Sequence, residues 1–228
     1  MNSKLDGLDV VITQKKIKNT YLRVCSSTGK VKVSAPKKMS IESIHHFVLS
    51  KLKWIQQQQK KISTAAPIGP KKYNDGEKHY FNGQCFLLKV IACEKKPHVM
   101  LLDAHIVISV HPNATKIKKQ ALLDHWYCEQ LTEKTALLIA KWERIMAVSV
   151  SRFSIRNMKT RWGSCSPKSR AIRINLALAK KSLDCLEYVV VHELAHLLEP
   201  SHNKRFVSLM DRFLPDWRVS CRELNNPI

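Results

Sequence analysis

VVVHELAHLLEPSH, residues 189–202, places three histidines within fourteen positions of a largely apolar segment. If the segment is a helix, His192 and His196 lie four residues apart and project from the same face. Glu193 is then offset from His192 by about 100°, beside the point where the two imidazoles meet. This spacing predicts two nitrogen ligands for a metal ion and a carboxylate that can act as base toward a water.

A third ligand is predicted to come from the residues just after this helix. Pro200 disfavours helical geometry, so the chain is expected to turn after Leu198 and to bring His202 back toward the other two histidines. Neutral imidazoles suit zinc, which is the predicted ion. Two alternatives stay open: Glu223 supplies the third ligand from a later helix, or the histidines are core residues that bind no metal.

Hydrophobic periodicity predicts an α+β fold in two parts. The predicted parts are a β-rich N-terminal region over residues 1–115 and a catalytic domain over residues 116–228 that starts with a long helix. Strands are expected at 8–13, 20–25, 31–36, 78–82, 85–93, 98–102, 105–110, 153–165 and 171–178, and helices at 40–60, at 116–146 and after Ser182. The residues show no internal repeat.

The composition indicates a soluble, strongly basic protein. Its 39 Lys and Arg against 18 Asp and Glu give a formal net charge of +21, which attracts anionic partners such as nucleic acid. The seven cysteines are scattered without a CxxC pair, as in a reduced, cytoplasmic protein. No apolar run is long enough to span a membrane, and the N-terminus does not have the pattern of a signal peptide. We therefore expect a cytoplasmic protein with no membrane partner.

Three blocks resemble a known family. MKTRWGSCS (158–166), IRINLAL (172–178) and YVVVHELAHLLEPSHNKRF (188–206) are similar to the YgjP-like family of zinc metallopeptidases, relatives of the SprT proteins. The N-terminal half is also similar to that family. The resemblance implies a zincin-like catalytic domain, with zinc on His192, His196 and His202 and with Glu193 as the catalytic base.

The resemblance leaves the substrate open. Peptide-bond hydrolysis is the first expectation, with a peptide or protein as partner and with 158–165 or 171–178 as the strand edge that receives it. Arg161 and Trp162 are expected to line the cleft. The family has also been linked to release of pyrophosphate from nucleoside triphosphates, specifically UTP, for which Arg156, Arg161 and Arg173 would hold the phosphates.

Two further possibilities remain. Some SprT relatives are proteases that act on DNA-bound proteins, so the basic surface is a candidate nucleic-acid contact. A basic binding protein with a structural zinc is the non-enzyme alternative. It does not explain Glu193, because a structural site closes its fourth position with protein.

Overall fold

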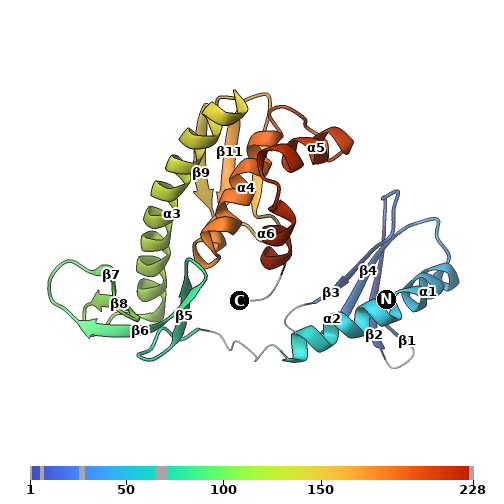
Figure 1. The fold of residues 1–228 in the computed structure, drawn as a ribbon. Helices are drawn as coiled ribbons and strands as arrows, with labels where there is room; N and C mark the ends of the chain where they lie inside the picture. Colours follow the sequence, from blue (N-terminus) through green and yellow to red (C-terminus); the bar gives the residue numbers. More distant parts are fainter. Residues whose placement is uncertain (1, 6–7, 26–28, 65–70, 226–228) are drawn as a thin grey trace. The chain divides into compact units, whose positions relative to one another are not determined.

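The computed structural model describes residues 2–5, 8–25, 29–64 and 71–225 (Figure 1). It divides into two compact units, Met1–Pro70 and Lys71–Ile228. This division differs from the predicted boundary at residue 115. Strands between residues 78 and 110 belong to the second unit, because buried side chains such as Leu88 and Ile108 share one core with the helices that follow them.

The first unit is a four-stranded sheet covered on one face by helices. The strands are β1 (Asn2–Leu5), β2 (Leu8–Lys15), β3 (Tyr21–Val24) and β4 (Val31–Pro36), in the order β1-β2-β4-β3. Alternate residues of β2 and β4 form a core with α1 (Ile41–Ser50) and α2 (Leu52–Thr64). The single helix predicted at 40–60 is therefore two helices, separated at Lys51 with φ −107° and ψ 9°.

The second unit begins with a sheet of the same topology. Its strands are β5 (Lys78–Phe81), β6 (Gln84–Ala92), β7 (His98–Leu102) and β8 (His105–Val110), in the order β5-β6-β8-β7. In both sheets the two central strands are parallel and each outer strand is antiparallel to its neighbour. The chain thus uses one β-sheet topology twice. This repeat was not visible in the sequence, because the two sheets share their pattern of strand pairing and not their residues.

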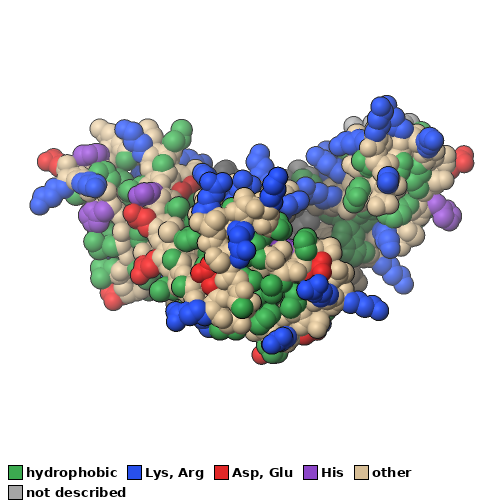
Figure 2. Space-filling model, turned by 90° about the horizontal axis from the view of Figure 1, so that it is seen from above, with side chains coloured by type: hydrophobic (Ala, Val, Ile, Leu, Met, Phe, Trp, Pro, Cys, Tyr) green, Lys and Arg blue, Asp and Glu red, His purple; other side chains and the backbone are tan. Residues whose placement is uncertain are grey.

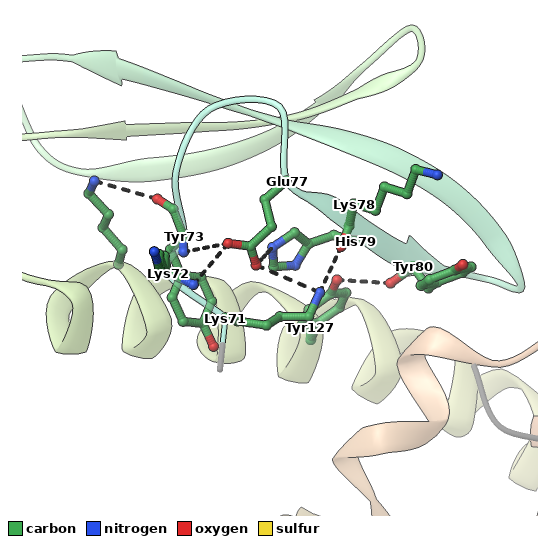
Figure 3. Close-up of polar contacts among 9 residues, drawn as sticks. Lys71, Lys72, Tyr73, Glu77, Lys78, His79, Tyr80 and Tyr127 are labelled. Carbon is green, nitrogen blue, oxygen red and sulfur yellow. Dashed lines mark hydrogen bonds and ion pairs between the residues drawn. The ribbon is translucent and has the colours of Figure 1, made fainter. Parts of the chain in front are cut away.

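A half-buried carboxylate, that of Glu77, holds the start of the second unit in place (Figure 3). Glu77 Oε2 accepts hydrogen bonds from the backbone N–H groups of Lys72 (2.9 Å) and Tyr73 (2.8 Å). Glu77 Oε1 lies 3.1 Å from Nε2 of His79, which is almost fully buried. Burial, reinforced by the positive charge of Lys71, lowers the pKa of His79 to about 4, so this imidazole is neutral near pH 7.

The long helix α3 (Lys116–Met146) joins the β5–β8 sheet to the rest of the second unit. Thr115 caps its N-terminus, and the hydroxyl of Tyr127 donates to the carbonyl of Tyr80 at 2.8 Å. One face of α3 is buried through eight residues: Leu123, Trp126, Tyr127, Leu131, Thr135, Ile139, Trp142 and Met146. Apolar spacing also placed Leu138 and Ile145 on this face, but Leu138 is only half-buried and Ile145 is exposed.

A third sheet follows, with β9 (Arg152–Arg156), β10 (Gly163–Ser166) and β11 (Ala171–Asn175) in the order β10-β11-β9. The strand predicted at 153–165 is wrong in its middle, because residues 157–162 form a loop between β9 and β10. The strand predicted at 171–178 ends at Asn175. There the side chain accepts a hydrogen bond from the N–H of Ala177 and starts the 3₁₀ helix Leu176–Lys180.

Three helices complete the second unit: α4 (Leu183–Ala195), α5 (Lys204–Phe213) and α6 (Trp217–Leu224). The central helix α4 packs against α3, β10, β11, α5 and α6, which explains why it is apolar nearly all round. The predicted α+β class is confirmed. Within the described ranges, no helix is both long and apolar enough to cross a membrane.

Candidate metal centre

Helix α4 carries the HELAH segment. The Ser182 side chain caps the helix by accepting from the N–H of Cys185, and the three valines 189–191 are buried. Valine lowers helix propensity, so burial against the neighbouring elements must stabilise this part of α4. The cap and the surrounding core therefore fix where His192 and Glu193 lie.

Three histidines converge at the C-terminal end of α4. His192, His196 and His202 each offer a nitrogen, and these atoms all lie within 4.8 Å of one another. His192 Nε2 and His202 Nε2 are 2.9 Å apart. The buried ring of Phe206 contacts all three imidazoles, with centroid distances of 4.9, 4.8 and 4.7 Å. The structure thus brings together the three residues whose convergence was predicted from their spacing.

The turn after α4 is built from the side chain and the carbonyl of Glu199. His196 Nδ1 lies 3.1 Å from the Glu199 carbonyl, which can only accept, so Nδ1 donates and Nε2 keeps its lone pair. The Glu199 carboxylate accepts from the N–H (3.2 Å) and the hydroxyl (2.9 Å) of Ser201. These contacts orient His196 and return the chain so that His202 lies beside α4.

Burial favours the neutral form of His192 and His196. It lowers the pKa of His192 to about 4, with smaller effects from His196 and His202, and it also lowers the pKa of His196. Metal ions bind the neutral imidazole through its lone pair, so this shift favours a cation over protons. Three converging imidazole nitrogens fit a divalent transition metal such as zinc.

Glu193 is buried beside the histidines. Its side chain is 5% exposed, and among the described residues its Oε2 has no hydrogen-bond partner. Burial raises the pKa of Glu193 to about 8, and the charge of Arg161 opposes that shift. A buried carboxylate oxygen without a partner is costly, so this atom is suited to bind a group that enters the site.

Gly163 on β10 makes room for Glu193. A Cβ at Gly163 would lie 2.5 Å from Glu193 Oε1 and 2.8 Å from its Cγ. Contacts this short do not occur between such atoms, so any larger residue would displace the carboxylate. The glycine lies in the RWGSCS block, but no local pattern links it to a residue thirty positions away.

A cleft of about 570 Å³ opens over these groups, within the size range of ligand sites. Both predicted cleft residues, Arg161 and Trp162, line it. The remaining lining residues are Gly163, Ser164, Cys165, Pro167, Tyr188, Val189, His192, Glu193, His196, Pro200, His202 and Leu224. The cleft therefore runs from β10 across α4 to the turn that carries His202.

Buried Asn175 positions the loop that carries Arg161 and Trp162. Its Nδ2 donates to the carbonyls of Met158 (2.9 Å) and Arg161 (2.7 Å), and its Oδ1 accepts from the Met158 N–H (3.3 Å). Its own N–H donates to the Trp162 carbonyl at 2.9 Å. One side chain from the end of β11 thus fixes the backbone on one wall of the cleft.

The other predicted residues lie elsewhere. Arg156 and Arg173 are exposed on β9 and β11 and are not among the residues that line the cleft. Glu223 on α6 lies near Lys181 and Cys185. Cys185 precedes His192 by two helical turns, about 10 Å along α4, so Glu223 is at the opposite end of that helix from the histidines.

Sequence reasoning missed Gly163, Phe206, Asn175 and Tyr188. Tyr188 lies one turn before His192 and contacts its ring edge-on, with centroids 5.8 Å apart. Tyr188 also stacks on Trp217 of α6 at 5.9 Å. Spacing could have indicated Tyr188, at i−4 from His192, and Phe206, four residues after His202. The roles of Gly163 and Asn175 depend on pairing between distant segments.

Comparison with known proteins gives one family. No curated protein is significantly similar to the chain. The zymogen of the metallopeptidase abylysin of Pyrococcus abyssi is 20% identical over 41% of this chain and 99% of that chain, with a TM-score of 0.35, too low to carry an argument. The model of the YgjP-like metallopeptidase domain matches residues 18–227. The match spans nearly the whole chain, and the chain therefore belongs to the YgjP-like metallopeptidase family, whose members are metal-dependent hydrolases.

Proposed function

We propose that this chain is a zinc-dependent peptidase, with His192, His196 and His202 as zinc ligands and Glu193 as general base. The observation that carries the proposal is the buried Glu193 Oε2, which has no partner among the described residues and lies beside three converging imidazoles. A closed structural site would not need a buried base at its edge. Membership of a metallopeptidase family supports the choice of a peptide bond as the target.

Bound zinc supplies Lewis-acid activation of a water and of the scissile carbonyl. The chain's own residues do the rest. Glu193 accepts a proton from the attacking water at a carboxylate oxygen and then gives that proton to the leaving amine nitrogen. Burial raises the pKa of Glu193 to about 8, which makes its carboxylate a stronger base for the first transfer. The fixed position against Gly163 keeps the carboxylate aimed at the cleft.

Strand β10 gives the substrate a binding edge. In the described sheet it pairs on one side only, with β11, and its residues Gly163–Cys165 line the cleft. An extended peptide can add to such an edge through backbone hydrogen bonds. Of the two predicted edges, β10 is favoured, because β11 lies between β10 and β9.

Hydrolysis of UTP or another nucleoside triphosphate receives less support from the site. Of the three arginines that were expected to hold phosphates, only Arg161 lines the cleft. A protease that acts on nucleic-acid-bound proteins would use the same catalytic residues and differ only in how its substrate is recruited.

The test is a substrate panel of unfolded casein beside the four nucleoside triphosphates, run on zinc-loaded wild type and Glu193→Gln. We expect casein cleavage by wild type, and its loss by at least a hundredfold in Glu193→Gln with zinc content unchanged. Glu133→Gln, a substitution at an exposed position of α3, is the matched control and should keep full activity. Pyrophosphate release that depends on Glu193, without casein cleavage, would overturn the peptidase proposal in favour of a nucleotide hydrolase.

A further inference from the structure

The first unit has an unusual charge for its size. Residues 1–70 hold 13 Lys and Arg but only three acids, Asp6, Asp9 and Glu42. In the right part of Figure 2, which draws the first unit, many Lys and Arg side chains project from the surface in view and few Asp and Glu side chains are visible. Three acids cannot neutralise thirteen bases, so the unit keeps an excess of positive charge.

Part of this charge lies on the sheet face that the helices leave uncovered. Val10, Ile12, Val31, Val33 and Ala35 point to the core with α1 and α2. Because strand side chains alternate, the opposite face carries Lys15, Tyr21, Arg23 and Lys32, all exposed, and we call these four the basic face. One acid, Asp9, lies on this same face of β2, at the opposite end of the strand from Lys15.

Two cations of the basic face oppose each other directly. Arg23 of β3 is the register partner of Lys32 of β4. Like charges in this arrangement destabilise a sheet, so the pair costs stability unless an anion lies over it. Tyr21 lies two residues before Arg23 on the same face of β3, opposite Ser34, with 59% of its surface exposed. The face thus combines cationic donors with an open aromatic ring.

More lysines surround the end of this face. The backbone of Lys37 donates to the carbonyl of Lys15 at 3.1 Å, so the loop after β4 lies against the loop after β2. These two loops carry Lys16, Lys18, Lys37 and Lys38, all exposed. The nearest acid in sequence is Glu42, in the first turn of α1. Exposed cationic side chains are therefore present from the middle of the sheet to this end of it.

We propose that the basic face binds single-stranded nucleic acid, with phosphates on Lys15, Arg23 and Lys32 and a base stacked on Tyr21. Single-strand binders combine a basic groove or face with aromatic rings on which bases stack. A membrane is disfavoured as the partner, because the face carries no exposed large aliphatic side chain that could enter a bilayer. This function is separate from the metal centre and does not depend on which bond that centre hydrolyses.

The experiment uses the full-length chain and fluorescein-labelled oligothymidylate of about 16 nucleotides, within the range of known site sizes. Anisotropy is measured over a series of salt concentrations. The site variant is Lys15→Gln, Arg23→Gln and Lys32→Gln combined. The control is Lys89→Gln, Lys95→Gln and Lys96→Gln combined, which removes the same charge from exposed positions of the second unit. Thermal unfolding checks that each variant folds.

We expect the site variant to weaken binding at least tenfold and to reduce the salt slope by about 2, since each phosphate contact contributes about 0.7 for single strands. The control should change affinity less than about twofold. Tyr21→Ala should weaken binding roughly tenfold at an unchanged salt slope, and Tyr21→Phe should restore it.

Four outcomes would overturn the proposal: equal losses in the two triple variants, no effect of Tyr21→Ala, equally tight binding of a duplex, or displacement of the oligonucleotide by polyglutamate or phosphatidylglycerol vesicles at matched charge. Either of the first two would mean that the net positive charge of the protein attracts the oligonucleotide without a specific site on the basic face. The last two would identify duplex, acidic-protein or membrane binding instead.

Discussion

Gly163 of β10 and Glu193 of α4 are packed so closely that a single added carbon at Gly163 would lie 2.5 Å from the Glu193 carboxylate. The absence of a side chain on the strand is therefore what allows the carboxylate to lie between sheet and helix. This contact joins the edge proposed to receive substrate to the group proposed to move the proton.

Gly163→Ala is expected to displace Glu193 while leaving the histidines in place. We predict a loss of kcat of about a hundredfold or more, with zinc content unchanged, and a loss of about 1–3 kcal/mol in unfolding free energy from overpacking. Metal analysis, steady-state kinetics and denaturant unfolding measure the three effects. Ser166→Ala, on the exposed end of the same strand, is the control. Unchanged kcat in Gly163→Ala would show that the position of Glu193 is not critical.

His202→Ala is expected to lower zinc affinity far more than Glu223→Ala. His202 Nε2 lies 2.9 Å from His192 Nε2, whereas Glu223 lies near Cys185 at the other end of α4. Zinc titration against a competing chelator gives both affinities. Equal affinities in the two variants would contradict the ligand set proposed here.

Asn175→Ala is expected to loosen the loop that carries Arg161 and Trp162. It leaves the carbonyls of Met158 and Arg161 without their amide donor. We predict a loss of roughly 2–3 kcal/mol in unfolding free energy and a several-fold rise in KM, with zinc affinity preserved. A purely structural role would lower stability without raising KM in the fraction that stays folded at low temperature. Asn157→Ala, exposed in the same loop, is the control.

Stability should fall on acidification because of His79. Its pKa is lowered from 6.5 to about 4 in the folded state, so the unfolded chain binds more protons between these values. The stability contributed by neutral His79 is present above pH 6.5 and is lost as the pH falls toward 4, by at most about 1.4 kcal/mol per pH unit.

Denaturant unfolding of wild type and His79→Gln at pH 7, 6 and 5 tests this prediction. The difference between the two proteins should shrink as the pH falls, since glutamine does not titrate. His125→Gln, at an exposed position of α3, is the matched control. A difference that stays constant with pH would show that proton binding by His79 does not contribute.

Local patterns predicted most of the secondary structure. The alternation of apolar and polar residues, together with turns marked by Gly and Pro, predicted β4 to β8 to within a residue or two. Apolar residues at helical spacing predicted α3 from residue 116 to residue 146. Failures came where tertiary contacts decide. The stretch 153–165 has the composition of a strand, but Asn175 bonds to its middle and holds residues 157–162 in a loop. The strand predicted to 178 ends where the same residue caps the next turn.

Helical spacing within α4 is enough to place His192 and His196 on one face with Glu193 beside them, because that spacing is a local property. The return of His202 was predicted from Pro200, and the three histidines do converge. The tertiary structure was needed to show that Gly163 leaves space for Glu193 and that Arg161 lines the cleft while Arg156 and Arg173 do not. It also revealed one sheet topology used twice. These relations join residues that are far apart in the chain. They arise from strand pairing and side-chain packing, and the periodicity of a short stretch of sequence does not encode them.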